Sequence, residues 1–323
     1  MKRTPFALAA LALAAALTTA VSGPVAAQET TLRAGVFVPV NTAFGEMCGR
    51  FINQLNSEAK GTVQIRLVGG PEAIPSFEQA NAVRSGVLDV ACLPPAFYVS
   101  VMPEADSQIL ATTSTLDQKK SGAYATLQAA HRARMGVHLL ASYGDGIRFH
   151  IFTNKPIARV EDLKAMKLRT TPNYTPFFQA LGVSLVNTAP GEVQQALERG
   201  VVDGYGWPLI GIFDLGWANF TRHRVDPGFY TVIVNVLVND KKWQSLSPAQ
   251  RQALESTATW FDQENLRWVA DKVASESKRQ ADAGIRSVDL GADFRKQAYD
   301  AYWAEMTKRA PDQTRALRQV LDK

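Results

Sequence analysis

Two arginines are the residues of this 323-residue chain with the clearest capacity for chemistry. Arg148 opens one apolar strand pattern and Arg169 ends another. A charge among apolar residues is costly unless it is paired, so each guanidinium needs a partner. A guanidinium can hold a carboxylate through two parallel N–H···O bonds, which supplies charge and fixes orientation. From the residues alone, Arg169 could hold a ligand carboxylate or form a salt bridge with Asp203 or Glu192.

Signatures of the common enzyme classes are missing from the sequence. It contains no G-x-S-x-G, H-E-x-x-H, P-loop or G-x-G-x-x-G pattern. The four histidines are His131, His138, His150 and His223. Their spacing does not indicate a metal site, so we expect them on the surface or in packing roles. We therefore expect no catalytic residue, no metal and no cofactor.

Cys48 and Cys92 are the two cysteines of the chain. Each falls among apolar residues, and their spacing indicates neither a zinc site nor a redox motif. A disulfide between a helix and a strand fits the sequence as well as two buried free thiols do.

The composition indicates a folded protein. Hydrophobic residues make up 46% and charged residues 20%, which excludes disordered, collagen-like and coiled-coil classes. The formal charge of +5 comes without a run of five like charges, so we expect no nucleic-acid partner. A short basic start, an Ala/Leu-rich stretch at 6–20 and Val25-Ala26-Ala27 are typical of a signal peptide. We place it at residues 1–27, with cleavage after Ala27 and export to the periplasm.

The hydrophobic periodicity predicts two α/β lobes. The first is a β-α-β-α-β series, and the second starts after Gly144-Asp145-Gly146, a candidate hinge. A capping box at Ser247 and a stop at Gly284 predict one helix longer than a single lobe. We expect this helix to pack through Leu254, Phe261, Leu266, Val269 and Val273. The fold class is therefore α/β, with mixed sheets, hinge strands and a long lobe-spanning helix.

The same patterns give bounds for the elements and lobes. The expected strands cover 31–38, 63–68, 87–93, 136–143, 149–153, 167–170, 184–187, 201–205 and 229–238. The expected helices cover 43–59, 76–85, 160–165, 176–181, 190–199 and 247–284. We place lobe I at residues 28–145 plus 233–272 and lobe II at residues 146–232 plus 273–323.

Several stretches carry a resemblance to a known family. The main ones are Phe152-Thr-Asn-Lys-Pro-Ile157, Asp162-Leu-Lys-Ala-Met-Lys-Leu-Arg169 and Pro190-Gly-Glu-Val-Gln-Gln-Ala-Leu-Glu-Arg-Gly-Val-Val-Asp-Gly204. Gly86-Val-Leu-Asp89, Asn239-Asp-Lys-Lys-Trp243 and Leu246-Ser-Pro248 also match. In order and spacing, the chain resembles the solute-binding receptors of tripartite ATP-independent periplasmic (TRAP) transporters over nearly all of its length after the signal peptide.

The resemblance implies a two-lobe periplasmic binding protein of the Venus-flytrap type. Such a receptor closes on an organic acid and delivers it to the membrane permease subunits of a TRAP transporter. In that family the arginine after Met-Lys-Leu is the principal carboxylate ligand, which here is Arg169. A second, earlier arginine often assists, which here is Arg148. We expect a monomer that performs no catalysis.

Some positions depart from the pattern of sugar-acid and dicarboxylate receptors. The usual Gln-Glu-Asn-Pro is Tyr205-Gly206-Trp207-Pro208, so Trp207 replaces a ligand-binding asparagine. Pro94 stands where an acidic contact is expected, and Phe77 lies where charged groups are frequent. A sugar acid would leave hydroxyls unpaired in such a site, at about 1–3 kcal/mol each. The departures therefore favour a small or aromatic monocarboxylate.

The predicted ligand contacts combine charged anchors with an apolar and aromatic surround. Arg169 and Arg148 are the anchors, and Asn235 is either a polar contact or a satisfied buried amide. The remaining predicted contacts are Trp207, Phe37, Phe77, Phe97 and Tyr98.

Two other functions fit the sequence. An exported enzyme could use Arg169 to anchor a carboxylate substrate and Asp145 or Glu192 as acid or base. A ligand-sensing subunit of a signalling system would need the same binding site as a transport receptor. Turnover separates the enzyme from a receptor, because a receptor returns its ligand unchanged.

Overall fold

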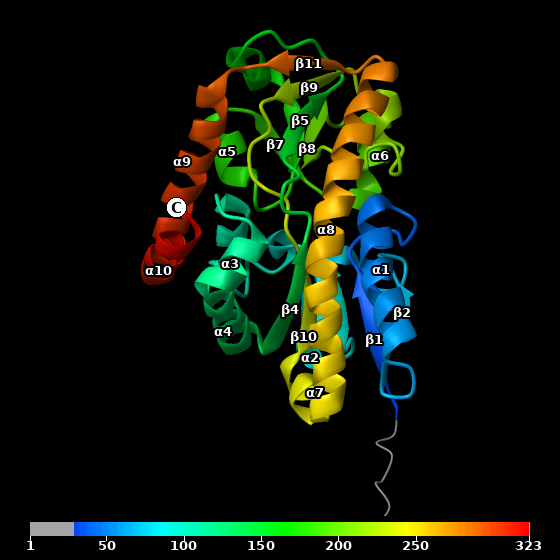
Figure 1. The fold of residues 1–323 in the computed structure, drawn as a ribbon. Helices are drawn as coiled ribbons and strands as arrows, with labels where there is room; N and C mark the ends of the chain where they lie inside the picture. The colour runs from blue at the N-terminus through cyan, green and yellow to red at the C-terminus, as the bar shows by residue number, and fades with distance from the viewer. Residues whose placement is uncertain (1–28, 323) are drawn as a thin grey trace, which may run out of the picture.

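The computed structural model describes residues 29–322 of the chain. The predicted signal peptide at residues 1–27 and its cleavage after Ala27 lie outside these residues. The described residues form two α/β lobes, one above the other in Figure 1, each with its own mixed β-sheet. The predicted fold class is confirmed. No helix in this part of the chain is both long enough and apolar enough to cross a membrane.

The sheet of lobe I has the strand order β2-β1-β3-β10-β4. Its strands are β1 (Thr30–Val36), β2 (Val63–Gly69), β3 (Val90–Leu93), β4 (Val137–Tyr143) and β10 (Val234–Asn239). β1 runs parallel to β2 and β3, whereas β10 runs antiparallel to β3 and β4. The chain enters β10 directly from lobe II, so this strand connects the two lobes.

Helices cover the sheet of lobe I. They are α1 (Ala43–Glu58), α2 (Gln79–Ser85), α3 (Thr115–Ser121), α4 (Ala123–Met135) and α7 (Asp240–Ser245), with short 3₁₀ helices η1 (Ser76–Glu78), η2 (Pro95–Phe97) and η3 (Ala105–Leu110). The Thr42 side chain caps α1 by accepting from the Gly45 N–H, as expected for a threonine at this position. Phe44, Phe51 and Leu55 then lie on one buried face of α1, which sets the direction of the helix against the core.

A disulfide joins Cys48 of α1 to Cys92 of β3. Of the two alternatives that the sequence left open, a disulfide or two buried free thiols, the structure has the disulfide. A disulfide between buried elements is typical of proteins in oxidising compartments.

The sheet of lobe II has the strand order β11-β9-β5-β8-β6-β7. Its strands are β5 (Phe149–Thr153), β6 (Lys167–Thr170), β7 (Ser184–Asn187), β8 (Gly204–Pro208), β9 (His223–Asp226) and β11 (Arg286–Asp289). The helices of this lobe are η4 (Val160–Ala165), α5 (Thr175–Ala180), η5 (Pro190–Glu192), α6 (Val193–Glu198) and η6 (Trp217–Phe220). β6 runs parallel to both β7 and β8, so the carboxyl ends of these three strands meet at one edge of the sheet.

Helix α8 (Pro248–Asp282) spans both lobes, as predicted (Figure 1). Ser247 and Gln250 form the predicted capping box at its start. Leu254 and Phe261 are fully buried, whereas Leu266 is 43% exposed, so its predicted packing role is wrong. Asn265 and Trp268 take the buried positions of that turn instead.

The chain ends in two helices, α9 (Ala292–Arg309) and α10 (Pro311–Leu321). α9 packs against α5 of lobe II. α10 instead packs against α3, α4 and η3 of lobe I, and the Thr112 N–H donates to the Leu321 carbonyl. The boundary 273–323 for lobe II therefore needs correction, because buried Leu317 and Leu321 return the chain to lobe I.

Most of the remaining predicted bounds agree with the structure to within a few residues. The largest difference is the strand expected at 229–238, which the structure has as β10 from Val234 onward. Before that strand, Thr231 pairs only with Arg148 in an isolated bridge. Phe229 and Tyr230 pack in lobe II, where Phe229 lies 6.2 Å from Phe149 between ring centres. The start of the apolar run therefore packs in lobe II, and its end forms a strand in the sheet of lobe I.

Candidate functional site

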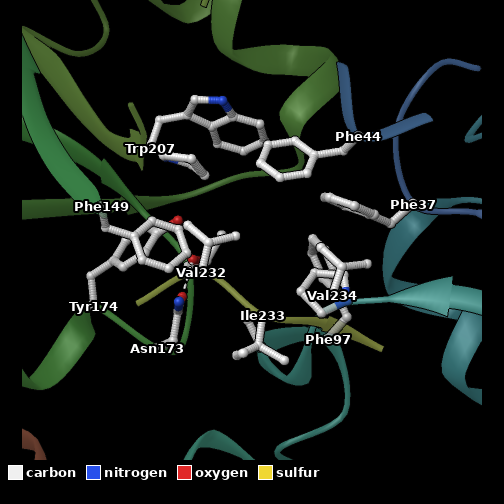
Figure 2. A pocket seen from close by; sticks show the side chains of 14 residues that line it. Phe37, Phe44, Phe97, Phe149, Asn173, Tyr174, Trp207, Val232, Ile233 and Val234 are labelled. Atoms are coloured by element: carbon white, nitrogen blue, oxygen red, sulfur yellow. Dashed lines mark hydrogen bonds between the residues drawn. The ribbon is translucent and has the colours of Figure 1, made fainter. Parts of the chain in front are cut away.

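An apolar pocket lies between the two lobes (Figure 2). The side chains around it enclose about 390 Å³ of space that no atom fills, part of it open to solvent. Its lining comes from both lobes and from the connection between them: Phe37, Phe44, Pro94, Ala96, Phe97, Phe149, Thr171, Asn173, Tyr174, Trp207, Pro208, Val232, Ile233 and Val234. A ligand in this position would contact both lobes at once.

The wall from lobe I is a cluster of aromatic rings. Phe37 follows β1, Phe44 lies in the first turn of α1 and Phe97 belongs to η2. The Phe37 ring centre lies 6.1 Å from that of Phe44 and 5.7 Å from that of Phe97, in tilted arrangements. Phe77 supports this wall from behind, with its ring 4.8 Å from Phe97. Lobe I therefore presents ring surfaces and no charged side chain to the pocket.

The wall from lobe II combines rings on two strands with one loop. Phe149 lies on β5 and Trp207 on the neighbouring β8, while Tyr174 lies directly before α5. The Trp207 Nε1 donates to the Ile210 carbonyl at 3.1 Å, so its indole N–H is already satisfied within the protein. Trp207 can therefore offer a ligand only the apolar surface of its ring.

The polar side chains in the pocket lining gather in one corner. They are Thr171, Asn173 and Tyr174, all from the loop that connects β6 to α5. The Thr171 hydroxyl donates to the Asn173 side-chain oxygen. Burial raises the pKa of the Tyr174 phenol, and interactions with the side chains of Arg169, Thr171 and Asn173 lower it in part. The phenol therefore keeps its proton at neutral pH.

Arg169 lies behind this corner and has no exposed surface. Its Nε and Nη2 donate to the Thr188 carbonyl at 3.0 and 2.9 Å, and its Nη1 donates to the Gly206 carbonyl at 3.3 Å. The guanidinium carbon is 5.5 Å from the centre of the Trp207 ring, within the range of cation–π attraction. Burial lowers the pKa of Arg169, and the nearby Tyr174 and Glu192 oppose this shift.

The predicted salt bridge of Arg169 to Asp203 or Glu192 does not form. Asp203 pairs with Lys155 at 2.6 Å, and Glu192 accepts from the Thr188 hydroxyl. Among the residues that the structure describes, no acidic side chain forms an ion pair with Arg169. A buried guanidinium bonded only to neutral oxygens carries a charge that a bound anion can neutralise.

The eight predicted ligand contacts fall into three groups in the structure. Phe37, Phe97 and Trp207 line the pocket. Phe77 and Arg169 lie directly behind its walls.

Three other predicted contacts lie away from the pocket lining. Arg148 turns toward α9, where its Nη1 donates to the Tyr299 hydroxyl at 3.1 Å. Its predicted role as an assisting anchor needs correction, because successive residues of a strand face opposite sides and Phe149 takes the pocket side.

Tyr98 and Asn235 belong to the core of lobe I. The Asn235 Nδ2 donates to the Tyr98 hydroxyl at 2.6 Å and to Gln108 at 2.8 Å, and its Oδ1 accepts from Ser142 at 2.7 Å. Tyr98 also contacts His131, at 3.1 Å. Of the two alternatives for Asn235, the structure shows a satisfied buried amide.

Several residues that line the pocket were not predicted from the sequence, above all Phe44, Phe149, Asn173 and Tyr174. The alternation of β5 could have identified Phe149, because it lies next to a charged residue on an apolar strand. No sequence signal distinguishes Asn173 and Tyr174 from ordinary loop residues.

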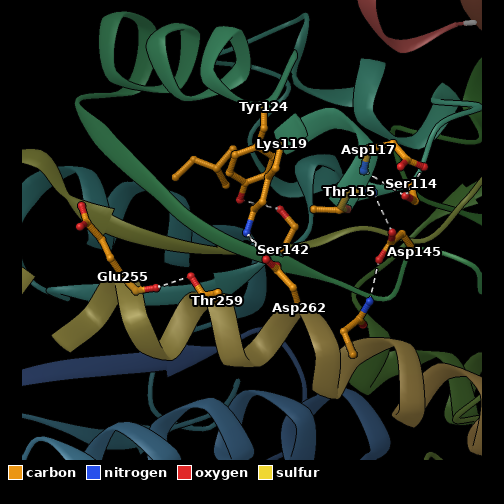
Figure 3. A network of polar contacts seen from close by, with 12 residues as sticks. Ser114, Thr115, Asp117, Lys119, Tyr124, Ser142, Asp145, Glu255, Thr259 and Asp262 are labelled. Atoms are coloured by element: carbon orange, nitrogen blue, oxygen red, sulfur yellow. Dashed lines mark hydrogen bonds and ion pairs between the residues drawn. The ribbon is translucent and has the colours of Figure 1, made fainter. Parts of the chain in front are cut away.

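The predicted hinge at Gly144-Asp145-Gly146 is held by a buried polar network (Figure 3). The Asp145 carboxylate accepts from the Thr115 N–H at 2.9 Å and from the Asn265 Nδ2 at 2.7 Å. The Asn265 Oδ1 in turn accepts from the Gly144 N–H at 2.8 Å. Both glycines have positive φ, a conformation that favours glycine. The network joins the hinge to α3 and α8.

The acid or base candidates of the enzyme alternative are not placed for chemistry in the pocket. Asp145 serves the hinge network, and Glu192 is exposed beside Thr188. Neither lines the pocket. The described part of the chain also contains no cluster of three or more histidine, cysteine or acidic side chains that could hold a metal ion.

A family model supports a relationship across most of the chain. The model described as "Bacterial extracellular solute-binding protein, family 7" matches residues 35–310. A solute-binding protein of Chromohalobacter salexigens is 22% identical, with 85% of this chain and 84% of the relative covered. A monocarboxylate 2-oxoacid-binding periplasmic protein of Nostoc is 24% identical, with 68% and 64% covered. The match to an uncharacterized protein of Sinorhizobium fredii spans only 44% of that relative.

Solved structures show the same fold. A TRAP periplasmic solute-binding protein from Desulfovibrio salexigens with bound orotic acid superposes with a TM-score of 0.81 at 18% identity. The superposition covers 90% of this chain and 97% of that one. A Bordetella pertussis extracytoplasmic solute receptor binding pyroglutamic acid gives a TM-score of 0.80 at 20% identity, covering 90% and 99%.

Proposed function

Because the chain belongs to family 7 of the bacterial extracellular solute-binding proteins, we propose that its pocket binds a small or aromatic monocarboxylate. The protein is an extracytoplasmic solute receptor, and its family works with TRAP-type membrane permeases. Under this proposal a monomeric receptor in the periplasm takes up the acid, delivers it to the permease subunits and leaves it chemically unchanged.

The observation that carries the proposal is the burial of the Arg169 guanidinium without an acidic partner. The guanidinium is fully buried behind the polar corner of the pocket, and it donates to the backbone carbonyls of Thr188 and Gly206. Removing a cation from water is costly unless a counter-charge is close. A ligand carboxylate in the polar corner would supply that counter-charge, since no described acidic side chain forms an ion pair with Arg169.

The rest of the pocket sets the chemistry of the ligand body. Phe37, Phe44, Phe97 and Phe149 offer ring surfaces, and Trp207 has its N–H occupied by Ile210. A hydroxyl placed against these groups would lose its water without gaining a partner, at about 1–3 kcal/mol. Hydroxyl-rich sugar acids are therefore disfavoured, and an acid with one polar end and an aliphatic or aromatic body fits.

Two relatives agree with this ligand class. One is described as binding monocarboxylate 2-oxoacids, and one solved structure holds pyroglutamic acid, a compact ring with a single carboxylate. Other relatives bind sugar acids, such as L-galactonate in a structure from Roseobacter denitrificans. The ligand class of this chain therefore depends on its own pocket residues.

Binding is coupled to the arrangement of the lobes under this proposal. The pocket lining comes from lobe I, from lobe II and from residues 232–234 of the connection to β10. A ligand that contacts all three parts favours the closed arrangement by its differential contacts with the two states.

The proposal is tested by removing the charge of Arg169. We expect Arg169→Met to abolish the thermal stabilisation that an apolar monocarboxylate gives the wild-type protein, because ligand linkage requires binding to the folded state. Arg169→Lys keeps a charge but loses the planar donor geometry, so we expect weakened binding. Isothermal titration calorimetry on both variants measures the loss of affinity.

Arg148→Met is the matched control, because Arg148 bonds to Tyr299 outside the pocket. It should bind the acid as the wild type does. Affinity close to that of the wild type in a folded Arg169→Met protein would contradict the proposal.

A further inference from the structure

A hydrogen bond outside the pocket joins the two lobes. The Ala43 N–H of lobe I donates to the Asp214 carboxylate of lobe II at 2.9 Å. Neither residue belongs to a segment in which the chain passes from one lobe to the other, which are the hinge, the connection at 232–234, α8 and the turn between α9 and α10. This interlobe bond therefore depends on how the two lobes are placed relative to each other.

The Ala43 N–H needs an acceptor from outside its own helix. Ala43 is the first residue of α1, and the first N–H groups of a helix have no acceptor within it. The Thr42 side chain caps the Gly45 N–H instead, at 3.4 Å. Ala43 is buried, and a carboxylate at a helix N-terminus is also favoured by the helix dipole. Asp214 thus satisfies, from the other lobe, a donor that the Thr42 cap does not reach.

Asp214 lies on the loop of residues 209–216, between β8 and η6, and this loop is tied to α8. The Gly211 N–H donates to the Glu276 carboxylate at 3.3 Å, and the Gln280 Nε2 donates to the Leu209 carbonyl at 2.6 Å. Glu276 and Gln280 are both buried. Because these bonds hold the loop within lobe II, its carboxylate loses little freedom when it meets α1.

Both ends of the interlobe bond adjoin residues that line the pocket. Phe44 follows Ala43 directly, and the Trp207 Nε1 donates to the Ile210 carbonyl of the 209–216 loop at 3.1 Å. Figure 2 shows the rings of Phe44 and Trp207 at the same edge of the pocket. The bond that holds α1 against the loop therefore also holds one ring of each lobe in place. Asp214 itself does not line the pocket.

We propose that Asp214 is a positioning residue for ligand binding, which stabilises the closed arrangement of the lobes through the Ala43 N–H without touching the ligand. The apparent affinity of a ligand is proportional to the population of the arrangement that binds it. A bond that exists only in that arrangement raises the affinity for every ligand by the same factor. The inference rests on the proposed function, because it needs a ligand around which the lobes close.

The acceptor of the interlobe bond is tested by Asp214→Ala. A thermal-shift screen of benzoate, isovalerate, pyroglutamate and L-galactonate selects the acids that stabilise the wild-type protein. Calorimetry then measures the affinity of each selected acid for the wild type and for the variant. We expect Asp214→Ala to weaken all of them by the same factor, about 5- to 10-fold, which corresponds to one exposed hydrogen bond to a charged group.

The donor of the interlobe bond is tested by Ala43→Pro, which removes the N–H. Proline is favoured at the first position of a helix, and Thr42 has the extended backbone that a residue before proline prefers. We expect a similar loss of affinity from Ala43→Pro, and no further loss when it is combined with Asp214→Ala. Losses that add in the double variant would show that the two residues act independently, and would overturn the inference.

Glu198→Ala provides the matched control. Glu198 is an exposed acidic residue of α6, so this variant removes the same charge from the surface of lobe II. It should bind each acid as the wild type does. Asp214 is also exposed, so the melting temperature of ligand-free Asp214→Ala should stay within about 2 °C of the wild-type value. A merely structural role of Asp214 would lower this melting temperature and leave the affinity of the folded protein unchanged.

The possible failures are distinguishable. If no acid of the panel binds the wild type, the proposed function fails, and this inference fails with it. If only L-galactonate binds, the proposed ligand class fails, and Asp214→Ala still tests the interlobe bond with that acid. If an acid binds the wild type, Arg169→Met abolishes binding and Asp214→Ala binds normally, the proposed function stands and this inference is overturned. Weakening of one acid alone by Asp214→Ala would also overturn it, because the bond acts on all ligands alike.

Discussion

We expect the substitution Asn265→Ala on α8 to destabilise the protein, because Asn265 is part of the polar network that holds the hinge. Asn265 is buried on α8, donates to Asp145 and accepts from the Gly144 N–H. The substitution removes both bonds and leaves the Gly144 N–H and one carboxylate oxygen of Asp145 without these partners. The Asp145 bond to the Thr115 N–H remains.

The expected size of the effect follows from the two lost bonds. A hydrogen bond to a charged group contributes about 1.5–3 kcal/mol, and a neutral one about 1 kcal/mol. We expect the free energy of unfolding to fall by about 3 kcal/mol. The loosened hinge should also allow a wider range of lobe arrangements, because the glycines on both sides of Asp145 impose little restraint of their own.

Urea denaturation of the Asn265→Ala protein measures this loss as a lower midpoint at an unchanged m-value. Gln263→Ala is the matched control, since Gln263 is exposed on the same helix and should change stability by less than about 0.5 kcal/mol. A loss below about 1 kcal/mol in Asn265→Ala would show that the network does not hold the hinge as described.

Three further predictions concern the pH dependence, the ligand profile and the disulfide. Burial raises the pKa of Asp106 to about 7, so the folded state keeps a proton that the unfolded state releases above pH 4. Stability should therefore fall as pH rises from 4 to 7, and Asp106→Asn should remove up to about 4 kcal/mol of this dependence in urea titrations; an unchanged pH profile would contradict the assignment. Trp207→Asn should lower the affinity for an aromatic acid while tolerating hydroxylated acids, measured by calorimetry, and an identical ligand profile would count against the apolar pocket. Replacing Cys48 and Cys92 by alanine opens a loop of 44 residues, so we expect a loss of about 4 kcal/mol in urea midpoints; equal midpoints for oxidised wild type and variant would refute a disulfide contribution.

The helices and strands that a local sequence pattern determines were predicted correctly from the sequence. The cap at Ser247 and the periodicity that follows it predict α8 almost to the residue. The strand at 149–153 agrees with β5 at both ends. These features depend on capping and alternation within a short stretch, so the residues alone determine them.

Features that depend on tertiary placement were harder to predict. Arg148 and Phe149 are neighbours on one strand, and only the orientation of β5 decides which of them faces the pocket. Tyr174 becomes a pocket residue through the course of the loop between β6 and α5, which no local pattern encodes. The return of α10 to lobe I likewise depends on packing between segments far apart in the chain.

Under the proposed function, the pocket between the lobes binds a carboxylate with an apolar body. The most direct measurement is a calorimetric comparison on the wild-type protein of three matched ligands: benzoate, benzamide and the sugar acid L-galactonate. We expect heat of binding for benzoate, with much weaker binding of the uncharged amide and of the hydroxylated acid. Tight binding of L-galactonate with no binding of benzoate would contradict it.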